Sequence, residues 1–357
     1  MVLVQLKFAI IGCGRIAKKH VASLMELNDT QIVSVCDLQR DRARKYGEKL
    51  GVPYYTNYHD MLKNEQIDIV CVLTPSGLHA KHTIDIAENY QKHIVCEKPM
   101  ALQLKDADEM INVCEKNNVR LFIVLQNRFN LAVQKLQKAL ENDRFGKLVL
   151  GTVRVRWSRP QSYYDSDMWR GTWELDGGCI TNQASHHIDL LQWMLGEPVE
   201  VTAKTATRLL NIEVEDTGVA IIKFRNGALG VIEVTTATRP NDLEGSISIL
   251  GEKGSVEIGG LAVNEIKIWQ FEGQFNQDDA LLANEYPENV YGFGHKKYLS
   301  HVVDCILNHQ PSMFDGVEGR KSLEIIHAIY ESVATENNVH LKFEPKKSKL
   351  GVSNEKH

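Results

Sequence analysis

Short apolar runs alternate with amphipathic segments over residues 1–126. The apolar runs are rich in Val and Ile and are bounded by polar turns: Phe8–Ile11, Gln31–Asp37, Asp68–Thr74, His93–Cys96 and Arg120–Gln126. Between them lie helical patterns, of which the clearest places Ala107, Met110, Ile111 and Cys114 on one face. Apolar strands separated by helices indicate a parallel sheet that is covered on both sides. We therefore expect a doubly wound α/β domain over residues 1–126.

The pattern changes after residue 126. A helix is predicted at Leu131–Glu141, a strand at Leu148–Trp157, and further helices at Ala184–Leu195 and Val317–Thr335. Asn226-Gly227 and the segment Gly251–Gly254 each separate two apolar runs, which is typical of antiparallel hairpins. We expect an α+β domain over residues 127–345, with a mostly antiparallel sheet whose uncovered face is free for a partner subunit. Residues 346–357 are predicted to form a disordered tail.

Composition and charge narrow the possible functions. The chain has 357 residues, of which 43% are hydrophobic and 24% charged, and its formal net charge is −5. This mildly acidic balance argues against a general nucleic-acid binder or a protein of anionic membranes. No apolar run approaches the roughly 20 residues of a membrane helix, and we expect no signal peptide. The seven cysteines include no C-x-x-C pair, which favours reduced thiols in a cytoplasmic protein.

The first apolar run leads into a glycine motif, G-x-G-x-x-A, formed by Gly12, Gly14 and Ala17. Gly12 permits a tight turn and Gly14 lets the backbone approach a pyrophosphate, while the next helix, entered through Arg15 and Ile16, offers free N–H groups. Asp37 follows Ala17 by 20 residues, where a ribose-binding acid belongs. The motif predicts an NAD site. Arg40 leaves open a preference for NADP, and a strand–turn–helix without ligand is the structural alternative.

Two further motifs follow predicted strands, at the edge where open α/β sheets bind ligands. Thr74-Pro75 with His79 follows one strand, and Glu97-Lys98-Pro99 follows the next. A lysine after a strand is usually a solvated surface charge. Its place beside an expected nicotinamide site favours a role in chemistry instead. His79 either contacts the cofactor region or begins the following helix.

These motifs, together with the block Gly177–Asp189, resemble the Gfo/Idh/MocA oxidoreductase family over nearly the whole chain. The resemblance implies a nicotinamide cofactor, an open sheet in the second domain, and hydride transfer at a sugar or cyclitol carbon. It implies that Lys98 and His186 form the catalytic pair, and that Thr74, Pro75, His79, Glu97 and Lys98 line the cofactor site. Many members carry Asp four residues before the catalytic His. Here that position is Asn182, which implies a neutral hydrogen-bonding role.

The segment 151–173 combines arginines with aromatic residues. Guanidinium groups match pyrophosphate and carboxylate, and aromatic faces suit uracil or sugar rings. We expect Arg159, Tyr163 and Tyr164 to contact the substrate, whereas Arg154 and Arg156 share one strand face and cannot both be assumed to line the site. The alternative is an exposed loop with packing aromatics.

The segment 157–183 also resembles the nucleotide-sugar branch of the family, in particular UDP-N-acetylglucosaminuronate 3-dehydrogenases of surface-polysaccharide pathways such as lipopolysaccharide O-antigen synthesis. This resemblance implies a UDP-sugar substrate, a homotetramer and, in some relatives, cofactor recycling by 2-oxoglutarate. It implies substrate contacts from the following residues: Lys98, Asn127, Arg128, Asn182, Gln183 and His186.

Other functions remain open from the sequence. A free-sugar or inositol dehydrogenase has the same motifs, and a non-catalytic NAD(H)-binding regulator can reuse the same fold. His186-His187 with Asp189 suggests a metal, but neighbouring side chains on a helix diverge and no third spaced ligand follows. We expect no metal site.

Overall fold

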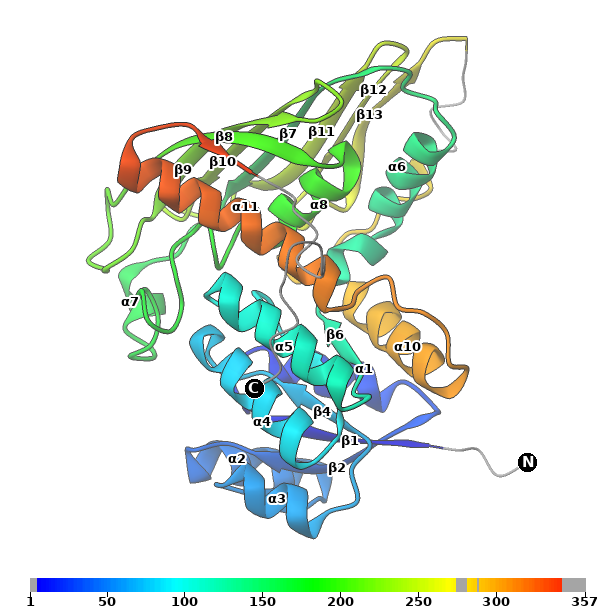
Figure 1. Cartoon of the computed structure of the whole chain (residues 1–357), viewed down its shortest axis with the longest axis vertical. Helices are drawn as coiled ribbons and strands as arrows, with labels where there is room; N and C mark the ends of the chain where they lie inside the picture. Colours follow the sequence, from blue (N-terminus) through cyan, green and yellow to red (C-terminus); the bar gives the residue numbers. More distant parts are fainter. Residues whose placement is uncertain (1–4, 274–280, 288, 342–357) are drawn as a thin grey trace, which may run out of the picture.

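The computed structural model describes residues 5–273, 281–287 and 289–341. Its N-terminal sheet has six parallel strands, and Figure 1 shows it in the lower half of the molecule. The spatial order is β3 (Tyr54–Tyr55), β2 (Thr30–Cys36), β1 (Leu6–Ile11), β4 (Ile69–Val72), β5 (His93–Cys96) and β6 (Leu121–Ile123). Successive strands are added on one side of β1 up to β3 and on its other side from β4 onward, so the topological switch point lies between β1 and β4. The carboxyl ends of the strands at such a point form a ligand-binding crevice.

Helices surround this sheet, as the alternating pattern predicts. They are α1 (Ala17–Met25), α2 (Arg40–Leu50), α3 (Tyr58–Asn64), α4 (His79–Asn89) and α5 (Leu104–Lys116), with short 3₁₀ turns η1 (Ser76–Leu78) and η2 (Gln126–Phe129). The buried residues of α5 are Ala107, Met110, Ile111 and Cys114, the face predicted from their spacing. The doubly wound α/β fold is thereby confirmed.

One helix of the first core comes from the far end of the chain. Helix α10 (Gly294–Leu307) buries Tyr298, Leu299 and Val302 in the same hydrophobic cluster as the six-stranded sheet. Figure 1 shows this orange helix beside α1, with which it is in contact. The hydrophobic pattern of the chain did not lead us to predict this helix. Its packing places His295, at its start, close to the strand ends of the first sheet.

The second sheet has eight strands and is mostly antiparallel, as predicted. Its order is β13 (Glu265–Phe271), β12 (Gly254–Gly259), β11 (Glu244–Gly251), β7 (Leu148–Arg156), β10 (Leu229–Thr235), β9 (Thr217–Phe224), β8 (Pro198–Ala206) and β14 (Val339–His340). Only the neighbours β7 and β10 are parallel. The β9–β10 hairpin turns at Asn226-Gly227, where Gly227 has a φ of +89°, and β11 and β12 form the second predicted hairpin.

Helices cover one face of this sheet and leave the other open. Helices α8 (Ser185–Leu195) and α11 (Gly316–Thr335) pack on the covered face, while α6 (Leu131–Glu141) lies toward β12 and α7 (Gln161–Tyr164) follows β7 (Figure 1). Helix α11 also contacts α5 and β6, so it joins the two domains. On the open face Val219, Ile221 and Leu229 are 47–57% exposed. An apolar sheet surface of this kind is suited to a partner.

Three further expectations concern the whole chain. All seven cysteines are buried and free, as expected of reduced core thiols. None of the helices in the described ranges combines the length and apolarity that a membrane span requires. The predicted tail, residues 346–357, lies outside the described residues.

Candidate active site

The glycine turn between β1 and α1 is shaped for close approach by a ligand. Gly12 has a φ of +97°, and a Cβ there would lie 2.4 Å from the Leu73 carbonyl oxygen, so only glycine fits. A Cβ at Gly14 would meet no atom within 4 Å, which leaves that side of the turn open. No side chain caps the N-terminus of α1, which Arg15 and Ile16 precede. Its first N–H groups are therefore free to bind phosphate oxygens.

Asp37 directly follows β2 and lies beside this turn. Its carboxylate accepts the Cys13 N–H at 2.8 Å and the Gln39 N–H at 2.8 Å. These bonds fix the carboxylate against the glycine turn, and each oxygen keeps a further lone pair for a ribose hydroxyl. The open glycine turn, the uncapped helix and the oriented acid together fit a dinucleotide. The nicotinamide ring, when bound, supplies the acceptor for a hydride.

His79 joins the loops that follow β4 and β5. The ring is 1% exposed, with Nδ1 2.8 Å from the Pro99 carbonyl oxygen and Nε2 2.8 Å from the Thr74 carbonyl oxygen. Of the two alternatives left open by the sequence, His79 does begin a helix, α4. Its ring fixes the loops of Thr74-Pro75 and Lys98-Pro99 from behind and is too buried to reach a cofactor directly.

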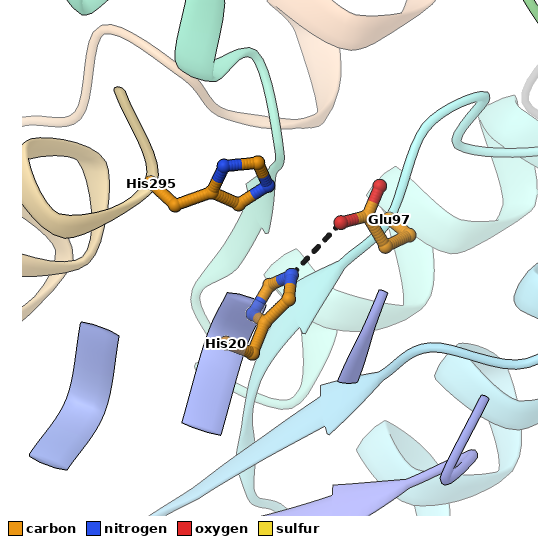
Figure 2. A group of neighbouring side chains, drawn as sticks. All are labelled: His20, Glu97 and His295. Atoms are coloured by element: carbon orange, nitrogen blue, oxygen red, sulfur yellow. Dashed lines mark hydrogen bonds and ion pairs between the residues drawn. The ribbon is translucent and has the colours of Figure 1, made fainter. Parts of the chain in front are cut away.

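A cluster of three buried side chains lies behind Lys98. Figure 2 shows His20 of α1, Glu97 after β5 and His295 of α10, with a 2.8 Å hydrogen bond between His20 Nε2 and a Glu97 carboxylate oxygen. Burial alone would raise the pKa of Glu97, but the His20 bond and nearby cations outweigh it and lower the pKa to about 2. Among the described residues these three alone have the spacing of a metal site. The adjoining Lys98 charge disfavours a cation there.

Lys98 extends from this cluster toward the second domain. Its Nζ donates to the main-chain carbonyl of Asn182 at 2.7 Å, and its own main-chain N–H donates to the Glu97 carboxylate at 3.1 Å. Burial lowers the pKa of the Lys98 ammonium, Glu97 and Asp176 oppose that change, and Arg159 adds to it. The ammonium is thus a tethered, half-buried group whose proton is easier to lose than that of a surface lysine.

His186 lies in the first turn of α8, four residues after Asn182. The ring is 8% exposed, and its Nε2 accepts an N–H from the Gln126 side chain at 3.0 Å. Burial first, and the Lys98 charge second, lower the pKa of His186 well below its usual value. The imidazole is therefore neutral at physiological pH, and its Nε2 can accept a proton once it gives up the Gln126 hydrogen bond. Lys98 and His186, expected to act as a pair, come from different domains and lie near each other.

The loop after β7 supplies cationic and aromatic groups on the substrate side. Arg159 and Arg170 lie over the ring of Tyr163, with guanidinium carbons 5.7 and 4.4 Å from its centre. Arg159 also pairs with Asp242 at 2.9 Å, and Arg170 donates to the Tyr163 hydroxyl at 2.6 Å. Arg159, Tyr163 and Arg170 are half-buried. This group keeps part of its positive charge accessible, which suits an anionic ligand.

The same loop reaches back onto the cofactor domain. The Arg15 guanidinium lies 5.0 Å from the centre of the Tyr163 ring and 3.3 Å from the Ser166 hydroxyl. Arg42 of α2 forms an ion pair with Asp167 at 2.7 Å. The segment that carries the expected substrate contacts therefore touches the glycine turn, and the cofactor and substrate regions adjoin.

Several expected substrate contacts lie elsewhere in the structure. Arg128 is 3% exposed, and Asp189 and Glu318 hold its guanidinium at 2.6 and 3.0 Å. Tyr164 is 5% exposed, with its hydroxyl 3.3 Å from that of Thr236. Neither presents a free polar group to a ligand, and we reassign both to internal packing. The interaction of one arginine with the buried Asp189 and the half-buried Glu318 could not be seen from the spacing of 128, 189 and 318.

Two strand arginines also lie away from the site. Arg154 and Arg156 lie on one face of β7, as their spacing predicted, and that face is the open one of the second sheet. There Arg156 binds Glu233 at 2.6 Å, and Arg154 lies 3.4 Å from Glu257. Both guanidinium groups are thus neutralised far from the covered face that carries His186.

Asn127 and Gln183 keep polar atoms without a partner in the described structure. Asn127 is 4% and Gln183 5% exposed, and the side-chain oxygens Asn127 Oδ1 and Gln183 Oε1 accept no hydrogen bond there. His186 Nδ1, which carries the ring proton, and Gln126 Oε1 also have no hydrogen-bond partner. Unpartnered buried polar atoms are costly. The unpartnered atoms of Gln126 and His186, two side chains in contact, favour a polar ligand that completes them.

Sequence reasoning missed Gln126, Arg170 and Asp176 as site residues. All three stand inside segments singled out from the sequence, but only the structure shows that Gln126 contacts His186 and that Asp176 contacts Asn182. A Rossmann sheet with an open glycine turn, a ribose-side acid and a Lys–His pair defines a nicotinamide-dependent dehydrogenase.

The chain belongs to the Gfo/Idh/MocA oxidoreductase family. Residues 6–125 match the profile of its NAD-binding Rossmann fold, and residues 137–341 match that of its C-terminal alpha/beta domain. The cofactor is accordingly NAD, and the chain is an NAD-dependent sugar-dehydrogenase-type enzyme.

Two solved structures are similar along nearly the whole chain. The WlbA dehydrogenase of Bordetella pertussis, in complex with NADH and UDP-GlcNAcA, is 42% identical, with a TM-score of 0.91 over 95% of this chain and 99% of that one. The WlbA dehydrogenase of Chromobacterium violaceum, with the same two ligands, is also 42% identical, with a TM-score of 0.90 over 96% and 98%. A curated relative, myo-inositol 2-dehydrogenase of Thermotoga maritima, is 27% identical over 94% of this chain and 98% of its own length.

Proposed function

We propose that this chain oxidises the 3-hydroxyl of a UDP-N-acetylglucosaminuronate-type sugar to the 3-keto sugar, with NAD as hydride acceptor. The observation that carries the proposal is the 42% identity, over nearly the full length, to two dehydrogenases in complex with NADH and UDP-GlcNAcA. The same two structures align with TM-scores of 0.90 and above, so the shared length includes both domains.

The side chains of the site support this chemistry. Oxidation of a secondary alcohol releases a hydride from carbon and a proton from oxygen, so a base must contact the hydroxyl while a cation stabilises the developing alkoxide. Lys98 and His186 are the two groups placed for these tasks. The neutral imidazole of His186 can accept the proton, and the Lys98 ammonium, held on Asn182, can polarise the oxygen. The reverse assignment uses Lys98 as the base.

The charges of the site support a nucleotide sugar. The chain as a whole carries −5, yet Arg159 and Arg170 lie close enough to Lys98 to lower the pKa of its ammonium. A uronate linked to a pyrophosphate offers three negative charges to such a group. A neutral polyol offers none, and would leave these cations without a partner.

A free-sugar or inositol dehydrogenase is the second candidate. It is favoured by the 27% identity to the Thermotoga maritima enzyme over 94% of this chain. A non-catalytic NAD(H)-binding regulator is a third, from a different functional class. Turnover separates these possibilities directly.

The deciding experiment follows NADH formation at 340 nm with a panel of substrates. The panel contains UDP-N-acetylglucosaminuronate, UDP-N-acetylglucosamine, myo-inositol and glucose, each with and without 2-oxoglutarate to reoxidise a tightly held cofactor. With 2-oxoglutarate the readout is the 2-hydroxyglutarate formed, because reoxidation removes the 340 nm signal. We expect turnover with the uronate, and weaker or no turnover with UDP-N-acetylglucosamine because it lacks the carboxylate. Turnover with inositol or glucose alone would overturn the proposal, and binding of NADH with no turnover at all would favour the regulator.

The wider setting is part of the same proposal. We place the reaction in the cytoplasm, in the supply of sugars for surface polysaccharides such as lipopolysaccharide O-antigen. We also propose a homotetramer, supported by the exposed Val219, Ile221 and Leu229 on the uncovered sheet face. Sedimentation equilibrium of the wild type and of Ile221→Asp tests this assembly, because a charge there would dissociate subunits that pack through the sheet.

A further inference from the structure

Asp176 is a buried carboxylate that the expected mechanism does not use. It precedes the glycine pair of the block that carries His186 and is 1% exposed. One oxygen accepts the Gly171 N–H at 2.8 Å, and the other accepts an N–H from the Asn182 side-chain amide. Burial raises the pKa of Asp176, and the N–H donors of Gly171 and Asn182, with the charges of Arg170 and Lys98, oppose that rise and favour the ionised form. Asp176 therefore brings a fixed negative charge into the site.

Asn182 connects this charge to Lys98. Its side chain donates to Asp176, while its main-chain carbonyl accepts the Lys98 ammonium at 2.7 Å. The Asn182 main-chain N–H also donates to the Gly178 carbonyl at 2.9 Å, which closes a compact turn. Asp176 is thus two hydrogen bonds away from the lysine of the other domain, and it controls the side chain of the residue that holds that lysine.

The surrounding charges give Asp176 a second task. Arg159 and Arg170 lie near Lys98 and lower the pKa of its ammonium, whereas Glu97 and Asp176 raise that pKa. Glu97 is already held by His20 on the cofactor side. On the substrate side, Asp176 is the carboxylate that acts on Lys98. Cations that crowd together without such a charge would repel one another.

We propose that Asp176 is a positioning residue for Lys98. It fixes Asn182, whose carbonyl orients the Lys98 ammonium toward the reacting oxygen, and it balances the positive charge of the site. In this arrangement Asp176 supplies the negative charge and Asn182 supplies the contact with Lys98, so a carboxylate is not required at position 182. The proposal rests on the proposed function only in taking Lys98 as a catalytic group.

The test is a charge-relocation cycle at positions 176 and 182. Asp176→Asn keeps the shape but removes the charge, and the Asn182 amide must turn its oxygen toward the new N–H donor at 176 to keep a hydrogen bond. We expect kcat/KM to fall roughly 100-fold, as for a misoriented catalytic group. The limb of the pH profile that belongs to Lys98 moves to lower pH, because a negative charge that stabilised the ammonium is gone.

The double variant D176N/N182D reverses the pair. An amide at 176 can accept the Gly171 N–H and donate to a carboxylate at 182, so both hydrogen bonds and the charge return. We expect it to recover most of the lost kcat/KM and the original pH limb. The single variant N182D places two carboxylates, at 176 and 182, next to each other, and its kcat/KM should stay low. A wild-type pH profile in D176N, or a double variant no better than the singles, would overturn the proposal.

A control variant separates positioning from general folding. Glu215 is another buried carboxylate of the same region, and it accepts the Ile180 N–H at 3.0 Å and the Tyr330 hydroxyl at 2.9 Å. Glu215→Gln is expected to lower the melting temperature and leave the pH limb of Lys98 unmoved. If E215Q shifts that limb as far as D176N does, the effect is structural and the proposal fails.

A readout without turnover distinguishes failure of this inference from failure of the proposed function. Acetic anhydride acylates neutral amines, so the extent of Lys98 labelling against pH, read by mass spectrometry, reports its titration in the NADH complex. We expect Lys98 in D176N to become reactive at lower pH than in the wild type. Identical labelling curves would overturn the inference even if the wild type oxidises the uronate. A shifted curve in an enzyme that oxidises another sugar would leave it standing.

Discussion

Replacement of Arg128 by leucine distinguishes an internal ion pair from a substrate contact. The guanidinium is 3% exposed, binds Asp189 at 2.6 and 2.9 Å and Glu318 at 3.0 Å, and lies 4.8 Å from the centre of the Trp193 ring. Arg128→Leu leaves Asp189, which is 1% exposed, as a buried charge without its partner. Breaking a buried pair in this way costs about 3–5 kcal/mol, which corresponds to a melting temperature lower by roughly 6–20 °C.

The assay is thermal unfolding by differential scanning calorimetry, with steady-state kinetics on the uronate beside it. The exposed pair Arg225–Glu197 provides the matched control, because Arg225→Leu removes a solvated arginine and is expected to change little. The double variant R128L/D189L should recover part of the loss, since it removes both charges. A variant that melts like the wild type but has a raised KM would refute the reasoning and return Arg128 to the substrate site.

Three further predictions concern the cofactor, the catalytic pair and pH. Lys98→Met and His186→Asn should each slow single-turnover hydride transfer by about 10²–10⁴-fold while NADH still binds, as measured by fluorescence; near-normal rates would refute the assignment. Asp37→Ser should weaken NADH binding about tenfold and reduce the preference for NADH over NADPH, because the carboxylate accepts hydrogen bonds from ribose hydroxyls and repels a 2′-phosphate. Binding titrations with NADH and NADPH that match those of the wild type would contradict this role. Burial lowers the pKa of His187 and His295 to about 3, so the unfolded chain binds protons below pH 6.5 that the folded chain does not. The free energy of unfolding should therefore fall by about 1.4 kcal/mol per histidine and pH unit below pH 6.5. Urea denaturation at pH 7.5, 6 and 5 tests this, and a pH-independent midpoint would exclude it.

The sequence predicted the fold well where the pattern is local. The spacing of Ala107 to Cys114 and the Asn226-Gly227 turn each depend on near neighbours, and both appear in the structure as expected. Helix α10 was not predicted, because its apolar face is buried only by a sheet that ended about 170 residues earlier in the chain. The parallel pairing of β7 with β10 is a long-range contact of the same kind.

The site residues likewise fall into those that a local motif identifies and those that only the folded structure identifies. Gly12, Asp37, Lys98 and His186 stand in motifs whose chemistry requires those residue types, so their positions could be inferred from the sequence. The sequence made both Arg159, from the arginines and aromatics of its loop, and Arg128, from the resemblance to the nucleotide-sugar branch, candidates for substrate contact. They differ in what lies opposite them, since Asp189 and Glu318 enclose one while the other stays half-buried beside Tyr163. Asp176 was missed for a related reason, because its partner Asn182 is identified only by the folded turn.

The most direct test of the central claim uses UDP-N-acetylglucosaminuronate labelled with deuterium at C3. Wild-type enzyme is mixed with NAD in a single turnover, and the reduced cofactor is analysed by mass spectrometry. The account predicts that the deuterium moves to the nicotinamide ring, that NADH formation is slower than with unlabelled sugar, and that Lys98→Met abolishes the transfer. Reduced cofactor without deuterium, or no reduction by this sugar while myo-inositol reduces NAD readily, would contradict it.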